Sequence, residues 1–141
     1  MKVFSITRDF GPRSAMEKIT KELLDDGTAK FVATPDNADV ILLGMSSQPE
    51  LAKQEMAACD TAVINRIPFA LFADTFGAWG RPWFEFYSEA ASALFVVSPA
   101  EAEKARELFP NAQIVVSGNP TWEDFFFPRY TRLEVRTKLE I

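Results

Sequence analysis

The stretch between residues 72 and 87 concentrates the side chains best suited to chemistry. It carries two carboxylates, Asp74 and Glu85, together with Arg81 and several aromatic rings, among them Trp79. Aromatic faces stack on flat ligands, and a carboxylate beside apolar rings can accept a proton from a hydroxyl group. We therefore expect Asp74 to act as a catalytic base supported by Glu85, with Trp79 and Arg81 binding substrate. The alternative is a small satellite core in which Arg81 pairs with Glu85.

Two further loops offer polar groups where apolar runs give way to expected helices. Arg8 and Arg13 follow the first run and could hold an anion near free helical N–H groups. Gly44, Ser46 and Ser47 follow the third run and offer a tight turn and two hydroxyls. All five are candidate substrate-binding residues. The alternatives are an ordinary strand-to-helix turn in the first loop and, in the second, a serine that only caps the next helix.

A third polar turn, near the end of the chain, precedes an unusual run of phenylalanines. Gly118 gives this turn flexibility and Asn119 can cap the following helix, so both are candidate substrate-binding residues. Three consecutive rings, Phe125, Phe126 and Phe127, cannot all face one core. The remainder would form an exposed apolar patch, and such patches mark interfaces. The pattern therefore predicts a homodimer through this region as one interaction of the chain.

Composition excludes several classes of function. The 141 residues contain no histidine and a single cysteine, Cys59, so a histidine triad, a histidine metal ligand and an internal disulfide are excluded. No pattern for a metal or cofactor is present. The net charge of −5 gives no electrostatic basis for binding nucleic acid. No apolar run reaches the roughly 20 residues of a membrane span, and the first residues do not resemble a signal peptide, so we expect a cytoplasmic protein.

The expected elements place these loops at one edge of a sheet. Six short apolar runs alternate with segments of helical spacing, which favours an α/β domain with a mainly parallel sheet of about six strands. We therefore predict a three-layer, doubly wound Rossmann-like fold, in which ligands bind at the carboxyl ends of the strands. The predicted strands are residues 3–6, 31–33, 40–43, 69–73, 94–97 and 114–116.

Helix starts are indicated by a repeated capping pattern. A serine or threonine followed three residues later by glutamate can satisfy two free backbone N–H groups at a helix start. The capping pattern occurs at Ser14–Glu17, Ser47–Glu50, Ser98–Glu101 and Thr131–Glu134.

Cys59 falls on the apolar face of one of these expected helices, which predicts a core side chain rather than a nucleophile.

The order of three segments resembles a known group of enzymes. The segments read Ala-Asp-Val-Ile-Leu-Leu-Gly-Met-Ser-Ser at residues 38–47, Ile-Pro-Phe-Ala-Leu-Phe-Ala-Asp at 67–74, and Val-Val-Ser-Gly-Asn-Pro at 115–120. This order resembles the non-hydrolysing UDP-N-acetylglucosamine 2-epimerases, and is similar to lipid-A-disaccharide synthase and other enzymes of the glycosyltransferase-B fold. The resemblance extends over residues 38–141. The epimerases have an acidic residue where this chain has Met45 and a glutamate where it has Asp74, while Glu85 matches a carboxylate of theirs.

The resemblance implies half of a two-domain enzyme. Residues 1–128 would form the N-terminal, acceptor-side domain, and residues 129–141 would form a helix that begins the linker to a C-terminal nucleotide-binding domain. The expected ligand is a sugar acceptor or a nucleotide-sugar, and the half alone would be inactive. The alternative is a Rossmann-like binding or protein-interaction module without catalysis.

Overall fold

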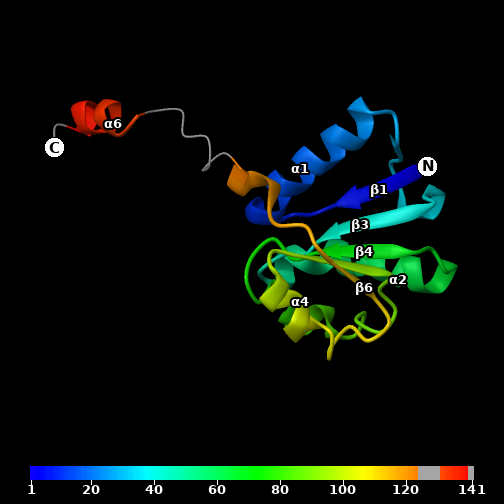
Figure 1. The fold of residues 1–141 in the computed structure, drawn as a ribbon. Helices are drawn as coiled ribbons and strands as arrows, with labels where there is room; N and C mark the ends of the chain where they lie inside the picture. Colours follow the sequence, from blue (N-terminus) through cyan, green and yellow to red (C-terminus); the bar gives the residue numbers. More distant parts are fainter. Residues whose placement is uncertain (124–130, 140–141) are drawn as a thin grey trace.

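The computed structural model describes residues 1–123 and 131–139. Its centre is a six-stranded sheet in which every pairing is parallel, with the order β2-β1-β3-β4-β5-β6. This confirms the predicted α/β fold with a parallel, Rossmann-like sheet (Figure 1). The strands are β1 (Lys2–Ile6), β2 (Lys30–Phe31), β3 (Val40–Gly44), β4 (Phe69–Phe72), β5 (Ala93–Val96) and β6 (Gln113–Val116).

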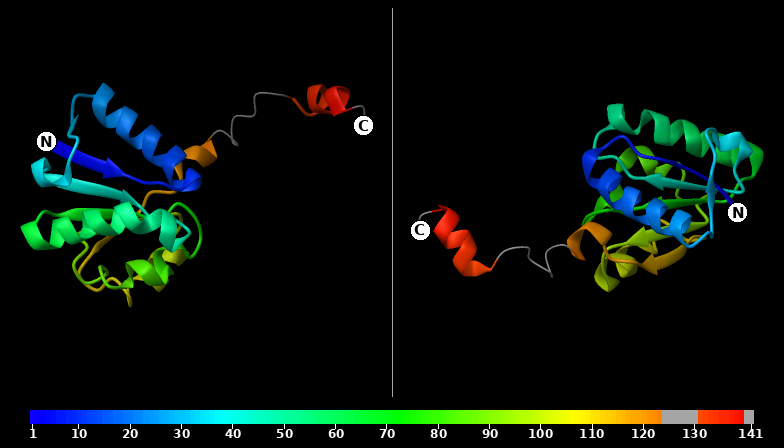
Figure 2. Two further views of the ribbon diagram at one scale, coloured as in Figure 1. Left: turned by 180° about the vertical axis from the view of Figure 1, so that it is seen from behind. Right: turned by 90° about the horizontal axis from the view of Figure 1, so that it is seen from above.

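The helices that join the strands cover both faces of the sheet. Each strand alternates its side chains between two cores, as the two-residue period of a strand requires. On β3, Leu42 packs with the core beneath α1, whereas Ile41 and Leu43 pack with the core that includes α2 and α4, so α1 and α2 lie on opposite sides (Figure 2). The helices are α1 (Phe10–Asp25), α2 (Pro49–Asn65), α3 (Pro82–Glu85), α4 (Pro99–Ala105) and α6 (Arg132–Leu139), with 3₁₀ turns η1 (Pro35–Asn37), η2 (Ala78–Gly80) and η3 (Pro120–Trp122).

The strand order reverses between β1 and β3. From β1 the chain passes through α1 to β2 on one side, and from β3 it passes through α2 to β4 on the other. In open parallel sheets, ligands bind at the carboxyl ends of the strands beside such a reversal. Cys59 of α2 is completely buried in the core, as predicted, and burial raises the pKa of its thiol far above the ordinary value.

Of the four predicted capping boxes, the one at Thr131–Glu134 is confirmed in full, whereas at Ser98–Glu101 only the serine cap forms, because the Glu101 carboxylate bonds to the loop after β4. Ser98 accepts a hydrogen bond from the Glu101 backbone N–H, at 3.3 Å, at the start of α4. Thr131 and Glu134 bond reciprocally at the start of α6, with the Glu134 N–H donating to Thr131 Oγ1 at 3.2 Å and Glu134 Oε2 accepting from the Thr131 N–H at 2.6 Å. The boundary predicted at residue 128 and the phenylalanines at 125–127 lie outside the described residues.

The other two capping predictions are wrong. Helix α1 begins at Phe10, four residues before Ser14, so the Ser14 hydroxyl instead donates to the Phe10 carbonyl at 3.2 Å. Helix α2 begins at Pro49 with Gln48 as its N-cap. The Ser47 hydroxyl instead donates to the carboxylate of Asp9, in the loop after β1, and that long-range contact replaces the local cap.

Candidate functional site

Asp74, directly after β4, is the centre of the best candidate site. Its side chain is 10% exposed, and its Oδ1 lies 3.6 Å from the nearest guanidinium nitrogen of Arg81. Asn119, from the turn after β6, donates from its side-chain amide nitrogen to the Asp74 backbone carbonyl at 2.6 Å, and its side-chain oxygen caps η3 by accepting from the Thr121 N–H at 2.9 Å. The structure therefore brings together three of the predicted site residues, and Gly118 makes the turn to Asn119 with a φ of 68°.

The start of α1 closes tightly over this carboxylate. A Cβ atom added at Gly11 would lie 2.7 Å from Asp74 Oδ2, closer than real Cβ atoms approach. Only a glycine allows the backbone of α1 to pass this near. Asp74, which follows β4, is therefore in direct contact with the start of α1.

The Asp74–Arg81 pair contains buried polar atoms that form no hydrogen bond among the described residues. Within the described residues, Asp74 Oδ1 and one terminal nitrogen of Arg81 are buried without a hydrogen-bond partner. Burial raises the pKa of the Asp74 carboxyl above its ordinary value, and the Arg81 charge opposes that rise. A partly desolvated carboxylate with a free lone pair is suited to accept a proton or a hydroxyl hydrogen bond.

Glu85 lies away from this pair. Its side chain is exposed at the end of α3, whereas Asp74 is buried. The alternative pairing of Arg81 with Glu85 is wrong, since Arg81 faces Asp74. The reason is burial. The Arg81 side chain is only 14% exposed, and its charge interacts more strongly with the buried carboxylate of Asp74 than with the exposed, hydrated carboxylate of Glu85.

A second polar network ties the loops after β1 and β3 together. The Ser46 hydroxyl donates to Glu55 Oε1 at 2.6 Å, and the Arg8 backbone N–H donates to the same oxygen at 3.1 Å. Asp9 completes the network: its N–H donates to Ser46 Oγ at 3.2 Å, and its carboxylate accepts from the Ser47 N–H at 2.8 Å and from the Ser47 hydroxyl. The two predicted serines are thus occupied in joining loops.

The two carboxylates of this network, Glu55 and Asp9, differ in how far they are buried. Glu55 is fully buried on α2, and desolvation raises the pKa of its carboxyl above the ordinary value. Asp9 is partly exposed, and the hydrogen bond from the Ser47 hydroxyl lowers the pKa of its carboxyl. The Asp9 charge also acts on Asp74, and Arg81 acts on Asp9, so the network lies close enough to influence the candidate site.

Gly44 is required for space rather than for a turn. It is the last residue of β3, and its φ is not among the positive values found at other glycines. A Cβ atom placed there would lie 2.4 Å from Thr7 Oγ1 and 2.9 Å from the Cβ of Pro12. Gly44 therefore allows the loop after β1 and the start of α1 to rest directly on the end of β3, which corrects its predicted role as a turn residue.

Trp79 fastens the loop after β4 through its indole nitrogen. Its indole N–H donates to Glu101 Oε2 at 2.8 Å, and the Gly77 backbone N–H donates to the same oxygen. These bonds fasten the loop after β4 to the first turn of α4, and the bond from Gly77 is the largest cause of the lowered pKa of the Glu101 carboxyl. Trp83 similarly donates from its indole N–H to the Ser46 carbonyl at 3.0 Å.

We predict that Glu101→Ala loosens this loop and lowers the free energy of unfolding by about 2 kcal/mol, because two partly buried donors, the Gly77 N–H and the Trp79 indole N–H, lose their acceptor. Urea denaturation followed by tryptophan fluorescence measures the loss. Glu103→Ala, on an exposed position of the same helix, is the control and should change stability by less than about 0.5 kcal/mol. Equal effects of the two substitutions would contradict the role of Glu101 as the loop's anchor.

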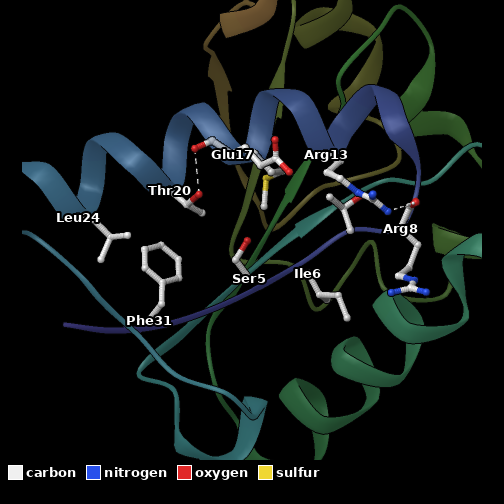
Figure 3. Close-up of a pocket in the computed structure, with 10 residues that line it drawn as sticks. Ser5, Ile6, Arg8, Arg13, Glu17, Thr20, Leu24 and Phe31 are labelled. Atoms are coloured by element: carbon white, nitrogen blue, oxygen red, sulfur yellow. Dashed lines mark hydrogen bonds between the residues drawn. The ribbon is translucent and has the colours of Figure 1, made fainter.

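Arg8 and Arg13 lie in a groove beside β1 rather than next to Asp74. The groove has a volume of about 490 Å³, and Figure 3 shows both side chains at one end of it. One terminal nitrogen of Arg13 donates to the Arg8 carbonyl at 2.9 Å. Apart from Gly44, Trp79 and Glu85, the candidate residues therefore divide among three places: the Asp74–Arg81 pair with its Asn119 turn, the serine network and this groove.

Sequence reasoning missed four important residues. Gly11, Asp9 and Glu101 form contacts with residues 22–63 positions away, which no local pattern reveals. Glu55 did carry a signal, since it shares the apolar face of its helix with Ala52 and Cys59. An acidic residue on such a face must be buried with partners, and this indicates a polar network.

Comparisons with protein-family models, curated proteins and solved structures give no match in any of the three. Across residues 1–123 and 131–139, no three His, Cys, Asp or Glu side chains are grouped as they would be around a metal ion. No helix in the described part of the chain is long and apolar enough to cross a membrane.

Proposed function

We propose that the chain is the acceptor-side half of a glycosyltransferase- or epimerase-like sugar-nucleotide enzyme, with its ligand bound at Asp74 and Arg81. The observation that supports this most is the buried pair itself, which keeps an unbonded carboxylate oxygen and an unbonded guanidinium nitrogen. The pair lies at the carboxyl end of β4, the edge where parallel sheets bind ligands. The motif order at residues 38–47, 67–74 and 115–120 supplies the sugar-nucleotide class.

In this proposal Asp74 accepts the hydrogen of a sugar hydroxyl. Burial raises its pKa, which makes the carboxylate a stronger proton acceptor than an exposed aspartate, and the Arg81 charge beside it opposes that rise. Asn119 fixes the backbone of Asp74 and so sets the direction of the carboxylate. Glu85, being exposed, has at most a supporting role from the rim.

The test is a titration of the chain with UDP-N-acetylglucosamine and with free N-acetylglucosamine, followed by backbone amide shifts in NMR. We expect shifts at residues 74–81 and 117–119. Asp74→Asn should weaken binding about tenfold or more, because the amide presents a donor where the sugar hydroxyl needs an acceptor.

Glu85→Gln is the matched control and should leave affinity unchanged within about twofold. Equal affinity of wild type and Asp74→Asn would remove Asp74 from the site. Shifts confined to other regions would reject the proposed location.

A non-catalytic binding module is the second candidate, and the exposure of Glu85 favours it, since no second carboxylate of the expected pair stands beside Asp74. Light scattering separates the two. The interaction module is expected to form a dimer or larger complex, whereas the acceptor-side half is expected to be a monomer.

A further inference from the structure

The outer edge of β1 is only half covered by its neighbour. Strand β1 has five residues and β2 has two, with pairs at Lys2↔Lys30 and Val3↔Phe31. The last bond between them runs from the Val32 N–H to the Val3 carbonyl, at 3.0 Å. Backbone groups along a parallel strand face its two neighbours alternately, so the next residue directed to this side is Ser5. The edge beyond Val3 is thus available for pairing.

The groove described above runs along this open edge. It is lined by Ser5 of β1 on one side and by a stripe of α1 on the other, and Figure 3 shows this arrangement. The stripe residues Arg13, Glu17, Thr20 and Leu24 are spaced by three or four positions, so they share one face of the helix. From Leu24 to Arg13 the helix rises about 16 Å, which accommodates four residues of extended chain at about 13 Å.

The two ends of the groove differ in chemistry. Leu24, which is 53% exposed, and Phe31 make one end apolar, whereas Arg8 and Arg13 make the other end basic (Figure 3). Neither arginine forms an ion pair with a carboxylate of the described residues, although Glu17 lies one turn from Arg13. The basic end also holds the first turn of α1, whose dipole favours negative charge.

We propose that this groove binds the C-terminal segment of a partner polypeptide, which adds to the sheet as a strand parallel to β1. A parallel strand ends at the same edge of the sheet as β1, and this places its terminal carboxylate beside Arg8 and Arg13. Its backbone pairs with the N–H and carbonyl of Ser5, and alternate apolar side chains pack on Thr20 and Leu24. An antiparallel strand would bring its positively charged N-terminus to the arginines, which disfavours that direction.

This proposal is independent of sugar binding at Asp74, because none of the lining residues belongs to the Asp74–Arg81 pair. The probe is the peptide acetyl-Thr-Val-Thr-Val with a free C-terminal carboxylate, titrated into the 141-residue chain. Binding is followed by amide shifts and by hydrogen exchange. We expect the Ser5 amide to exchange faster than those of Phe4 and Ile6 in the free protein, and to become protected when the peptide binds.

Three matched comparisons isolate the proposed contacts. The C-terminal amide of the same peptide should bind about tenfold more weakly, because it lacks the charge that the arginines recognise. Arg13→Gln should weaken the free-acid peptide to a similar degree, while Arg106→Gln, an exposed arginine on another element, should not. A peptide methylated on its backbone nitrogens should lose binding, since it cannot pair with the strand edge.

If a tenfold excess of the peptide over a protein sample of about 1 mM produces no amide shift at Ser5, the proposal is overturned, because even millimolar affinity would be detected under these conditions. Equal affinity of acid and amide peptides would overturn it as well, because it would show that the arginines are not used. A dimer that protects the Ser5 amide without peptide would also overturn it, because a second copy of the chain would then be the occupant.

Discussion

Gly44→Ala is expected to lower the free energy of unfolding by about 3 kcal/mol, because a single methyl group must enter space already filled from two sides. The added Cβ would meet Thr7 at 2.4 Å and Pro12 at 2.9 Å, and the latter belongs to the rigid start of α1. Relief requires the helix to move away from the sheet. Urea denaturation at neutral pH measures the loss.

Gly80→Ala is the control for this substitution, since no atom lies within 4 Å of the Cβ it would add. It should change stability by less than about 1 kcal/mol, the ordinary difference between glycine and alanine. If both variants unfold at the same urea concentration, the close approach at Gly44 has no energetic importance.

Glu55→Ala is expected to have the largest effect, a loss of about 4 kcal/mol, because it leaves a cavity and removes the acceptor of one buried and one partly buried donor. These donors are the Ser46 hydroxyl and the Arg8 backbone N–H. Glu50→Ala, on an exposed position of the same helix, should change stability by less than about 0.5 kcal/mol. A loss below that level for Glu55→Ala would show that the two loops are held together by other contacts.

Glu55→Gln separates the hydrogen bonds of this residue from its charge. The amide oxygen can still accept both bonds, but the side chain no longer ionises. Burial raises the pKa of Glu55 in the folded state above its value of about 4.5 in the unfolded chain. The folded state therefore binds the proton more tightly, and a rise in pH through this window favours unfolding.

The stability of Glu55→Gln relative to wild type should therefore increase as the pH rises from about 4 towards 7. Comparing the two proteins at each pH matters because Asp74, Asp9 and Glu101 titrate in both of them. Denaturation curves across this range provide the measurement. A constant difference between the two proteins would mean that Glu55 titrates alike in the folded and unfolded states.

The fold was largely predictable because its signals are local. The continuous apolar runs of β3 and β4 are buried on both faces, and this distinguishes a parallel sheet from an alternating one. The prediction of a strand at residues 31–33 starts one residue too late and is one residue too long, because the end of β2 is set by the turn towards η1 rather than by its own side chains. The predicted start of α1 at Ser14 is wrong for a similar reason, because its first turn is fixed by a long-range contact between Gly11 and Asp74.

The candidate site was predictable only in part. Asp74 follows β4 and Asn119 follows β6, and the carboxyl ends of these parallel strands lie at the same edge of the sheet on either side of β5, so the topology places the two residues at that edge. The partner of Arg81 depended on which carboxylate is buried, and sequence spacing favoured the nearer but exposed Glu85. The role of Trp79 depended on an acceptor 22 residues away, and such a pairing emerges only when the helices are packed.

The bond pattern around Glu55 also has a consequence for how the domain opens. This carboxylate belongs to α2, yet it holds the backbone that leads into α1 on the opposite side of the sheet. Fluctuations of the two outer layers are therefore mechanically linked at the point where the strand order reverses. Neither layer can detach there alone, so this junction is expected to open as one cooperative unit, while the half-covered rim at β2 can fray separately.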